Sequence, residues 1–257
     1  MTEPRRDTRA ARPFVTLNVA AGVDGKIAPV GGGKVNFGGA GDRARMESLR
    51  AEADAVLIGG GTLRAEDPPL LIRDPATRAA RVAAKGSPHP LNVVVTSCLP
   101  DGLDGMDFFR EPETEKLAFT TARTPAALQE TAARFARVEV VASDATGRVD
   151  LAAVVRKLSA LGVRRLLLEG GGELNFSMLE ADLIDEIYLT LCPFVFGGRT
   201  APTAFDGAGF TRDRVRKLAL KDHRIGTQNE VFLHYLVLPG SADVVQSPLF
   251  RRGLEIQ

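Results

Sequence analysis

Short apolar segments recur along the chain and alternate with segments that have helical spacing. The apolar segments are residues 13–20, 54–60, 91–97, 116–121, 137–143 and 164–170. Several of them are apolar at consecutive positions, so both faces of each strand need cover. Strands of this kind, separated by helices, form parallel sheets with helices on both sides. The sequence therefore predicts an α/β fold built as three layers around a largely parallel sheet.

The segments between these strands carry helix signals. Apolar side chains recur at helical intervals from about Asp42 to residue 53 and in residues 149–162, where Leu161 is expected to face inward. Residues 173–181 are also expected to be helical. Thr124 followed by Pro125 predicts an N-cap and the first residue of a helix.

The pattern changes after residue 184. Residues 184–197, 214–223 and 229–238 read as strands with no helix between them. Such strands are expected to complete the same sheet in antiparallel fashion. No change in composition marks a linker, so we expect one domain over residues 13–238. It would follow a disordered arm at residues 1–12 and precede a tail at residues 239–257.

Composition narrows the function classes. A chain of 257 residues, 44% hydrophobic and 25% charged, is ordinary globular protein. The formal net charge of +1 gives no field that favours nucleic acid or an anionic membrane. No apolar run approaches the roughly 20 residues of a membrane span, and no apolar segment of a secretory signal follows the basic start. Cys98 and Cys192 lie in separate apolar segments, which favours free thiols in the cytoplasm.

Two apolar segments run into three glycines and then into a helix, at residues 55–63 and 166–175. Glycines at the carboxyl end of a parallel strand let backbone N–H groups face a ligand, and a helix N-terminus favours an anion such as pyrophosphate. Neither stretch has the glycine spacing of a Rossmann motif or a P-loop. Each could be only a tight turn, but two of them on one sheet edge favour a ligand site.

Charged residues accompany the glycines. Glu169 stands between the strand and the second triplet, where it could hold or protonate a polar substrate. Alternatively, Glu169 is a solvated carboxylate or forms an ion pair with Arg164 or Arg165. Arg73 follows a loop stiffened by consecutive prolines, which suits a phosphate clamp, although a solvated surface charge is the other interpretation. Lys26 follows an Asp-Gly turn after the first strand.

Other site types leave no signal. His89, His223 and His234 are isolated and lack metal-ligand spacing, so no metal is expected. There is no G-x-S-x-G nucleophile motif. Two Tyr and no Trp argue against a base-stacking surface. The remaining interpretation is a pocket for an anionic cofactor and a polar substrate.

Several stretches together resemble the reductases of riboflavin biosynthesis, from about Phe14 to Leu236. They are VDGKIA, LRAEADAVLIGGGTLRAEDPPLLIR, PLNVVVTS, LLLEGGGELNFSMLEADLIDEIYLTLCPFVFGG and APTAFDGAGF. These enzymes occur as half of a bifunctional deaminase/reductase or as a stand-alone 2,5-diamino-6-ribosylamino-pyrimidinone 5′-phosphate reductase. The resemblance implies a dihydrofolate-reductase-like fold with a mixed, largely parallel sheet. The zinc-binding deaminase half has no counterpart here, so the stand-alone form is expected.

The resemblance also implies an activity and its residues. The expected reaction is hydride transfer from NADPH to C1′ of a ribosylamino group, in its ring-opened Schiff-base form, giving the ribitylamino product. The implied cofactor contacts are Thr62, Glu66, Ser97, Gly171, Gly172, Glu173, Leu174, Asn175, Phe176 and Ser177. The implied substrate contacts are Lys26, Arg50, Leu70, Arg73 and Glu169, with Glu169 also the candidate catalytic residue.

Some features leave alternatives open. Lys34 and Asn36 stand where the family usually has Ser and often an aromatic residue. A pterin or dihydrofolate reductase on the same fold, or a non-catalytic nucleotide-binding module, is therefore a rival interpretation. NADPH is expected rather than NADH, with Thr121 and Arg123 placed to hold the 2′-phosphate. A homodimer is expected from the apolar residues of 184–197, unless that strand is simply buried within the sheet.

Overall fold

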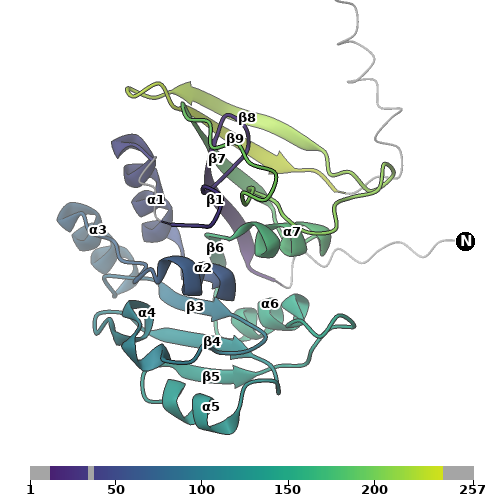
Figure 1. Ribbon diagram of the computed structural model, residues 1–257. Coiled ribbons are helices and arrows are strands. Elements are labelled where there is room, and N and C mark those ends of the chain that lie inside the picture. Colours follow the sequence, from purple (N-terminus) through teal and green to yellow (C-terminus); the bar gives the residue numbers. More distant parts are fainter. Residues whose placement is uncertain (1–11, 34–37, 240–257) are drawn as a thin grey trace, which may run out of the picture.

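The protein is described by a computed structural model over residues 12–33 and 38–239. Lys34 and Asn36 lie outside these ranges, as do most of the expected arm and tail. The centre is a nine-stranded sheet in the order β5-β4-β3-β2-β6-β1-β7-β9-β8, stacked from bottom to top in Figure 1. The strands are β1 (Phe14–Gly22), β2 (Ala55–Gly59), β3 (Leu91–Val95), β4 (Lys116–Thr120), β5 (Arg137–Val140), β6 (Arg165–Leu168), β7 (Glu186–Cys192), β8 (Leu218–Ile225) and β9 (Val231–Val237).

The sheet is mixed and largely parallel, as predicted. Strands β1 to β6 pair only in parallel fashion, with Phe14 opposite Arg165 and Ala55 opposite Leu166. The last strand, β9, is antiparallel to both β7 and β8. The prediction that the C-terminal strands are all antiparallel was wrong for β7, which runs parallel to β1.

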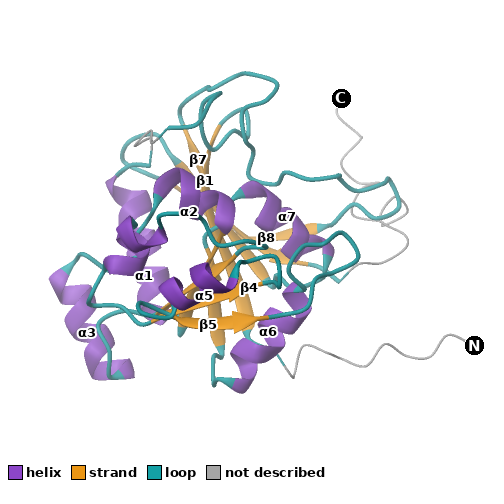
Figure 2. Ribbon diagram, turned by 60° about the horizontal axis from the view of Figure 1, so that its bottom comes forward, coloured by secondary structure: helices purple, strands orange, loops and turns teal. Residues whose placement is uncertain are grey.

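Helices cover both faces of the sheet. On one face lie α1 (Ala40–Glu52), α2 (Gly60–Glu66), α3 (Pro75–Lys85), α4 (Asp107–Arg110) and α5 (Ala126–Ala132), together with the short 3-10 helix η2 (Leu103–Gly105). On the other face lie α6 (Leu151–Ala160) and α7 (Gly172–Glu180). Figure 2 shows these layers, with α1 and α3 on one side of the strands and α6 and α7 on the other. In the described ranges, no helix is long and apolar enough to cross a membrane.

The core explains why the β6 segment is apolar at consecutive positions. Leu166 and Leu168 face the cluster that packs under α6 and α7, whereas Leu167 faces the cluster under α1 and α2. All three side chains are at most 1% exposed. A strand in this central position buries both of its faces, which is the condition that its sequence pattern predicted.

Two local predictions were wrong. Thr124 is not the N-cap of α5, because the cap is Pro125 and the Thr124 hydroxyl instead lies 2.5 Å from that of Thr120. Leu161 does not face inward, because α6 ends one residue earlier and the side chain is 43% exposed. Both errors lie at helix ends, where sequence patterns are least specific.

Strand β7 occupies an interior position. It lies between β1 and β9, and Ile187 is 2% exposed. The apolar character of this strand is therefore explained by burial within the sheet, and it gives no support to a dimer. The residues just beyond the strand differ, because Phe194 and Val195 are 47% and 72% exposed.

Candidate functional site

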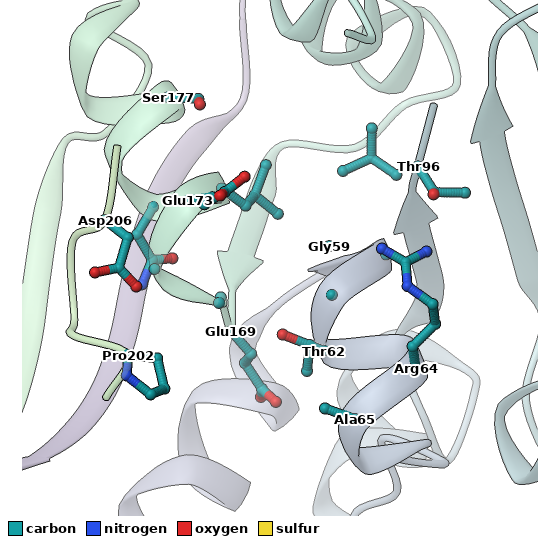
Figure 3. A pocket seen from close by; sticks show the side chains of 18 of the residues that line it. Gly59, Thr62, Arg64, Ala65, Thr96, Glu169, Glu173, Ser177, Pro202 and Asp206 are labelled. Carbon is teal, nitrogen blue, oxygen red and sulfur yellow. The ribbon is translucent and has the colours of Figure 1, made fainter. Parts of the chain in front are cut away.

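The carboxyl ends of the central strands enclose a cavity of about 600 Å³, within the range of small-molecule sites. Both glycine triplets line it, the first at residues 59–61 and the second at residues 170–172. The backbone N–H of Gly59 donates to the carbonyl of Gly170 at 2.8 Å, so the two turns lie side by side. Helices α2 and α7 leave these turns and face each other across the cavity (Figure 3). The prediction that both triplets lie on one sheet edge is confirmed.

Part of each triplet is required by packing. Gly170 has a φ of 88°, which glycine adopts without strain. A Cβ at Gly60 would collide with the Thr96 side chain, and a Cβ at Gly172 would collide with the carbonyl oxygen of Thr203. These three glycines hold the neighbouring segments close together.

Gly61 and Gly171 open onto the cavity. A Cβ at Gly61 would meet nothing within 4 Å, and one at Gly171 would meet only the Thr62 hydroxyl at 3.3 Å. Asn175 adds a polar group from α7, because its Oδ1 is buried and has no hydrogen-bond partner among the described residues. The free space beside the backbone and the helix N-terminus fit an anionic group that lies close to the chain. The unpaired Asn175 oxygen fits a hydrogen-bond donor on the same ligand.

Glu169 is held by a buried ion pair with Arg50. Its Oε1 and Oε2 accept hydrogen bonds from Nε and Nη2 of Arg50 at 2.7 and 2.6 Å. The two side chains are 10% and 8% exposed. Burial alone would lower the pKa of Arg50, but the charge and hydrogen bonds of Glu169 raise it above its ordinary value. The suggested pairing of Glu169 with Arg164 or Arg165 was therefore wrong.

Every guanidinium nitrogen of Arg50 donates a hydrogen bond within the protein. Its Nη1 donates to the carbonyl of Leu71 at 2.7 Å, so all three guanidinium nitrogens are engaged within the protein. Arg50 is absent from the residues that line the cavity, whereas Glu169 lines it. The geometry supports a role in which Arg50 fixes the orientation of Glu169 toward the cavity.

Most of the expected cofactor contacts line the same cavity. They are Thr62, Glu66, Ser97, Gly171, Gly172, Glu173, Leu174, Asn175 and Ser177. Phe176 differs, because its ring packs against Phe210 with 4.9 Å between the centroids. Any contact from Phe176 to a ligand in the cavity would have to come from its backbone.

Of the expected substrate residues, Glu169 lines the cavity and the other four do not. Lys26 donates from Nζ to the carbonyl of Ala201 at 2.8 Å, next to the lining residue Ile27. Leu70 is 2% exposed and belongs to the core under α1. Arg73 is exposed and has no hydrogen bond or ion pair within the described residues.

Neighbouring side chains fix the loop that carries Leu70 and Arg73. The Asn92 amide donates to the carbonyl of Pro69 at 2.9 Å. The backbone N–H of Ile72 donates to Nδ1 of the buried His89 at 3.2 Å. Arg73 therefore extends from an anchored backbone, which lowers the entropic cost of holding a ligand.

Sequence reasoning missed two cations of the cavity, Arg64 and Arg148. Arg64 lies two residues after Thr62, just past the first glycine triplet, so its place beside the motif was the available signal. Arg148 comes from a loop distant in sequence, which gave no signal.

The placement of the cofactor phosphate at Thr121 was wrong, because its hydroxyl is fully buried and donates to the carbonyl of Ser97 at 2.7 Å. Arg123 does not line the cavity either.

Comparison with known proteins agrees with this architecture. Residues 13–232 match the RibD C-terminal domain. A 2,5-diamino-6-ribosylamino-4(3H)-pyrimidinone 5′-phosphate reductase of Archaeoglobus fulgidus is 36% identical over 213 residues, which cover 80% of this chain and 93% of that protein.

Solved structures show the same fold. A pyrimidine reductase-like protein of Corynebacterium diphtheriae has a TM-score of 0.73 at 18% identity, over 90% of this chain and 94% of that one. The deaminase/reductase of Thermotoga maritima has a TM-score of 0.69 at 20% identity, over 90% of this chain and 58% of that longer one. The predicted dihydrofolate-reductase-like fold is confirmed. The chain belongs to the RibD C-terminal domain family.

Proposed function

We propose that this protein reduces the ribosylamino side chain of a pyrimidinone 5′-phosphate to the ribitylamino form in riboflavin biosynthesis, with NADPH as the reductant. The observation that carries the proposal is one cavity in which two glycine turns and the N-terminus of α7 face the anchored carboxylate of Glu169. Membership of the family and the name of the Archaeoglobus fulgidus relative support the same oxidoreductase reaction.

The residues of the cavity fit a dinucleotide. Gly171 is the N-cap of α7 and Gly172 its first residue, and the free backbone N–H groups of this helix start suit a pyrophosphate. Gly61 and Thr62 form the facing wall. When bound, the nicotinamide supplies the hydride that reduces C1′ of the ribosylamino group. The protein's own part is to orient the reacting groups and to exclude water from them.

Glu169 is the proposed catalytic residue. Arg50 holds both carboxylate oxygens in one orientation, so Glu169 presents a fixed acceptor to a substrate hydroxyl or amine. A positioned carboxylate of this kind can orient the substrate and can hold a proton during the reaction. Lys26, Leu70 and Arg73 would surround the remainder of the substrate.

Arg73→Ala is expected to raise KM for the phosphorylated substrate by about 10- to 100-fold, because a charge-assisted contact contributes roughly 1.5–3 kcal/mol. The affinity for NADPH should change little. Steady-state kinetics and cofactor titration measure the two effects. Arg156→Ala is the matched control, since Arg156 is 67% exposed on α6 and does not line the cavity. A change in cofactor affinity alone would show that Arg73 is assigned to the wrong ligand.

We also propose a homodimer, now on the basis of the exposed side chains of Phe194 and Val195. Light scattering at micromolar concentration should give twice the chain mass of 27.5 kDa. Val195→Glu should shift the mass toward the monomer, because a charge would be buried in an apolar contact. A monomeric mass for the unmodified protein would overturn the proposal.

The two cysteines are free, which suits the reducing cytoplasm.

The decisive assay follows NADPH oxidation by absorbance with three substrates in parallel: the diamino pyrimidine phosphate, its deaminated form and dihydrofolate. Turnover of either pyrimidine supports the proposal and decides which one is the substrate. Turnover of dihydrofolate alone would make the protein a pterin-type reductase. Cofactor binding without any turnover would leave a nucleotide-binding module.

A further inference from the structure

Two arginine side chains line the cavity, Arg64 from α2 and Arg148 from the loop before α6, and they differ in their partners. A guanidinium nitrogen of Arg148 lies 3.7 Å from the carboxylate of Glu173, and its backbone N–H donates to Asp144. The side chain of Arg64 has no hydrogen bond or ion pair within residues 12–33 and 38–239. An unpaired guanidinium on a cavity wall is available to an anionic ligand.

Gly60 allows Arg64 to lie against the start of α2. Residues four apart share one face of a helix, and side chains point back toward the N-terminus. Nη1 of Arg64 lies 3.1 Å from the position that a Cβ at Gly60 would take, and the Thr96 side chain borders the same position. Figure 3 shows the guanidinium directed toward Thr96 and away from Glu169. Arg64 thus places its charge at the end of the cavity remote from the catalytic carboxylate.

The direction of a bound dinucleotide rests on the function proposed above. If NADPH reduces a substrate beside Glu169, the dinucleotide can lie in the cavity in only one direction. The nicotinamide must lie near Glu169, and the pyrophosphate fits the start of α7. The adenosine then lies toward the end of β3, where Thr96 and Ser97 line the wall. The carbonyl of Ser97 accepts a hydrogen bond from the Thr121 hydroxyl. The Ser97 hydroxyl has no partner in the part of the chain that the structure describes.

We propose that Arg64, together with the Ser97 hydroxyl, binds the 2′-phosphate of the adenosine and thereby selects NADPH over NADH. A guanidinium donates a fork of hydrogen bonds to a phosphate, and a hydroxyl donates one more. NADH carries a neutral hydroxyl at this position and would leave the Arg64 charge without a partner. Arg64 is therefore a specificity-determining residue.

Calorimetric titration with adenosine 2′,5′-bisphosphate and with 5′-AMP tests this assignment without any turnover. The two probes differ only in the 2′-phosphate. The unmodified protein should prefer the bisphosphate. Arg64→Ala should lower the affinity for the bisphosphate by about 10- to 100-fold and leave the affinity for 5′-AMP unchanged. Arg64→Lys should restore part of the preference, because it keeps the charge without the fork.

Arg148→Ala is the matched control, since it removes the same charge from the same cavity, and it should keep the preference. The assignment is wrong if Arg64→Ala weakens both probes equally, or if Arg148→Ala abolishes the preference instead. Equal binding of both probes by the unmodified protein would also overturn it, because the site would then not discriminate between NADPH and NADH. Binding of neither probe would refute this inference and the proposed cofactor site together.

Discussion

Glu169→Gln is expected to lower turnover of the pyrimidine substrate by about 100-fold or more, since positioned acid–base groups contribute roughly that much. The amide keeps the shape of the side chain and can still accept a hydrogen bond from Arg50. It loses the negative charge and the ability to hold a proton. The affinity for NADPH should stay nearly unchanged, because the glycine turn and the backbone N–H groups at the start of α7 are intact. Wild-type turnover in this variant would remove Glu169 from the mechanism.

Stability is the main confounding effect, and the ion pair shows how to separate it from catalysis. Arg50 and Glu169 are both almost fully buried, so the loss of either partner leaves a charge without compensation. Such a loss costs about 3–5 kcal/mol, whereas replacement of both partners by apolar residues is often neutral. Arg50→Met should therefore lower the melting temperature strongly. The double variant Arg50→Met/Glu169→Leu should recover stability without recovering turnover.

This outcome would divide the roles of the two residues. If the double variant melts near wild type and stays inactive, the carboxylate is needed for the reaction and not only for the fold. If it melts near wild type and regains turnover, the pair is purely structural. Both measurements use the complete chain, and circular dichroism confirms that each variant is folded before its kinetics are compared.

The position of the two glycine turns at one edge of the sheet could be predicted from the sequence, because it follows from strand direction. Parallel strands place all their carboxyl ends on one side, so the glycines after β2 and β6 had to be neighbours in any such sheet. The hydrogen bond between Gly59 and Gly170 is the structural result. The same logic placed Glu169 at the cavity, because it directly follows a buried strand.

The partners of the charged residues could not be predicted in this way. Arg50 lies 119 positions before Glu169 on a helix, and only the packing of α1 beside β6 brings the two together. Arg164 and Arg165 were the neighbours in sequence, but Arg165 instead pairs with Glu52. The position of β7 could not be predicted for a similar reason, since the apolar pattern of a strand does not tell whether it lies at the edge or inside the sheet.

Gly171→Val is expected to abolish NADPH binding with little effect on the fold. The residue has φ −64° and ψ −174°, which any amino acid can adopt, so no left-handed strain opposes the substitution. The nearest atom to its Cβ would be the Thr62 hydroxyl at 3.3 Å, across the cavity wall. The branched side chain would fill the space where the pyrophosphate approaches α7.

A second substitution keeps this test independent of local packing at Gly171. Gly61 lines the opposite wall, and a Cβ there meets nothing within 4 Å, so Gly61→Val should bind NADPH poorly and melt at or above wild type. Gly105→Val is the control, because Gly105 also has open surroundings but lies outside the cavity. NADPH titration beside a thermal melt decides the matter. If Gly171→Val and Gly61→Val both melt near wild type and bind NADPH normally, the glycines serve only as strand-to-helix turns, and the cofactor does not lie against them.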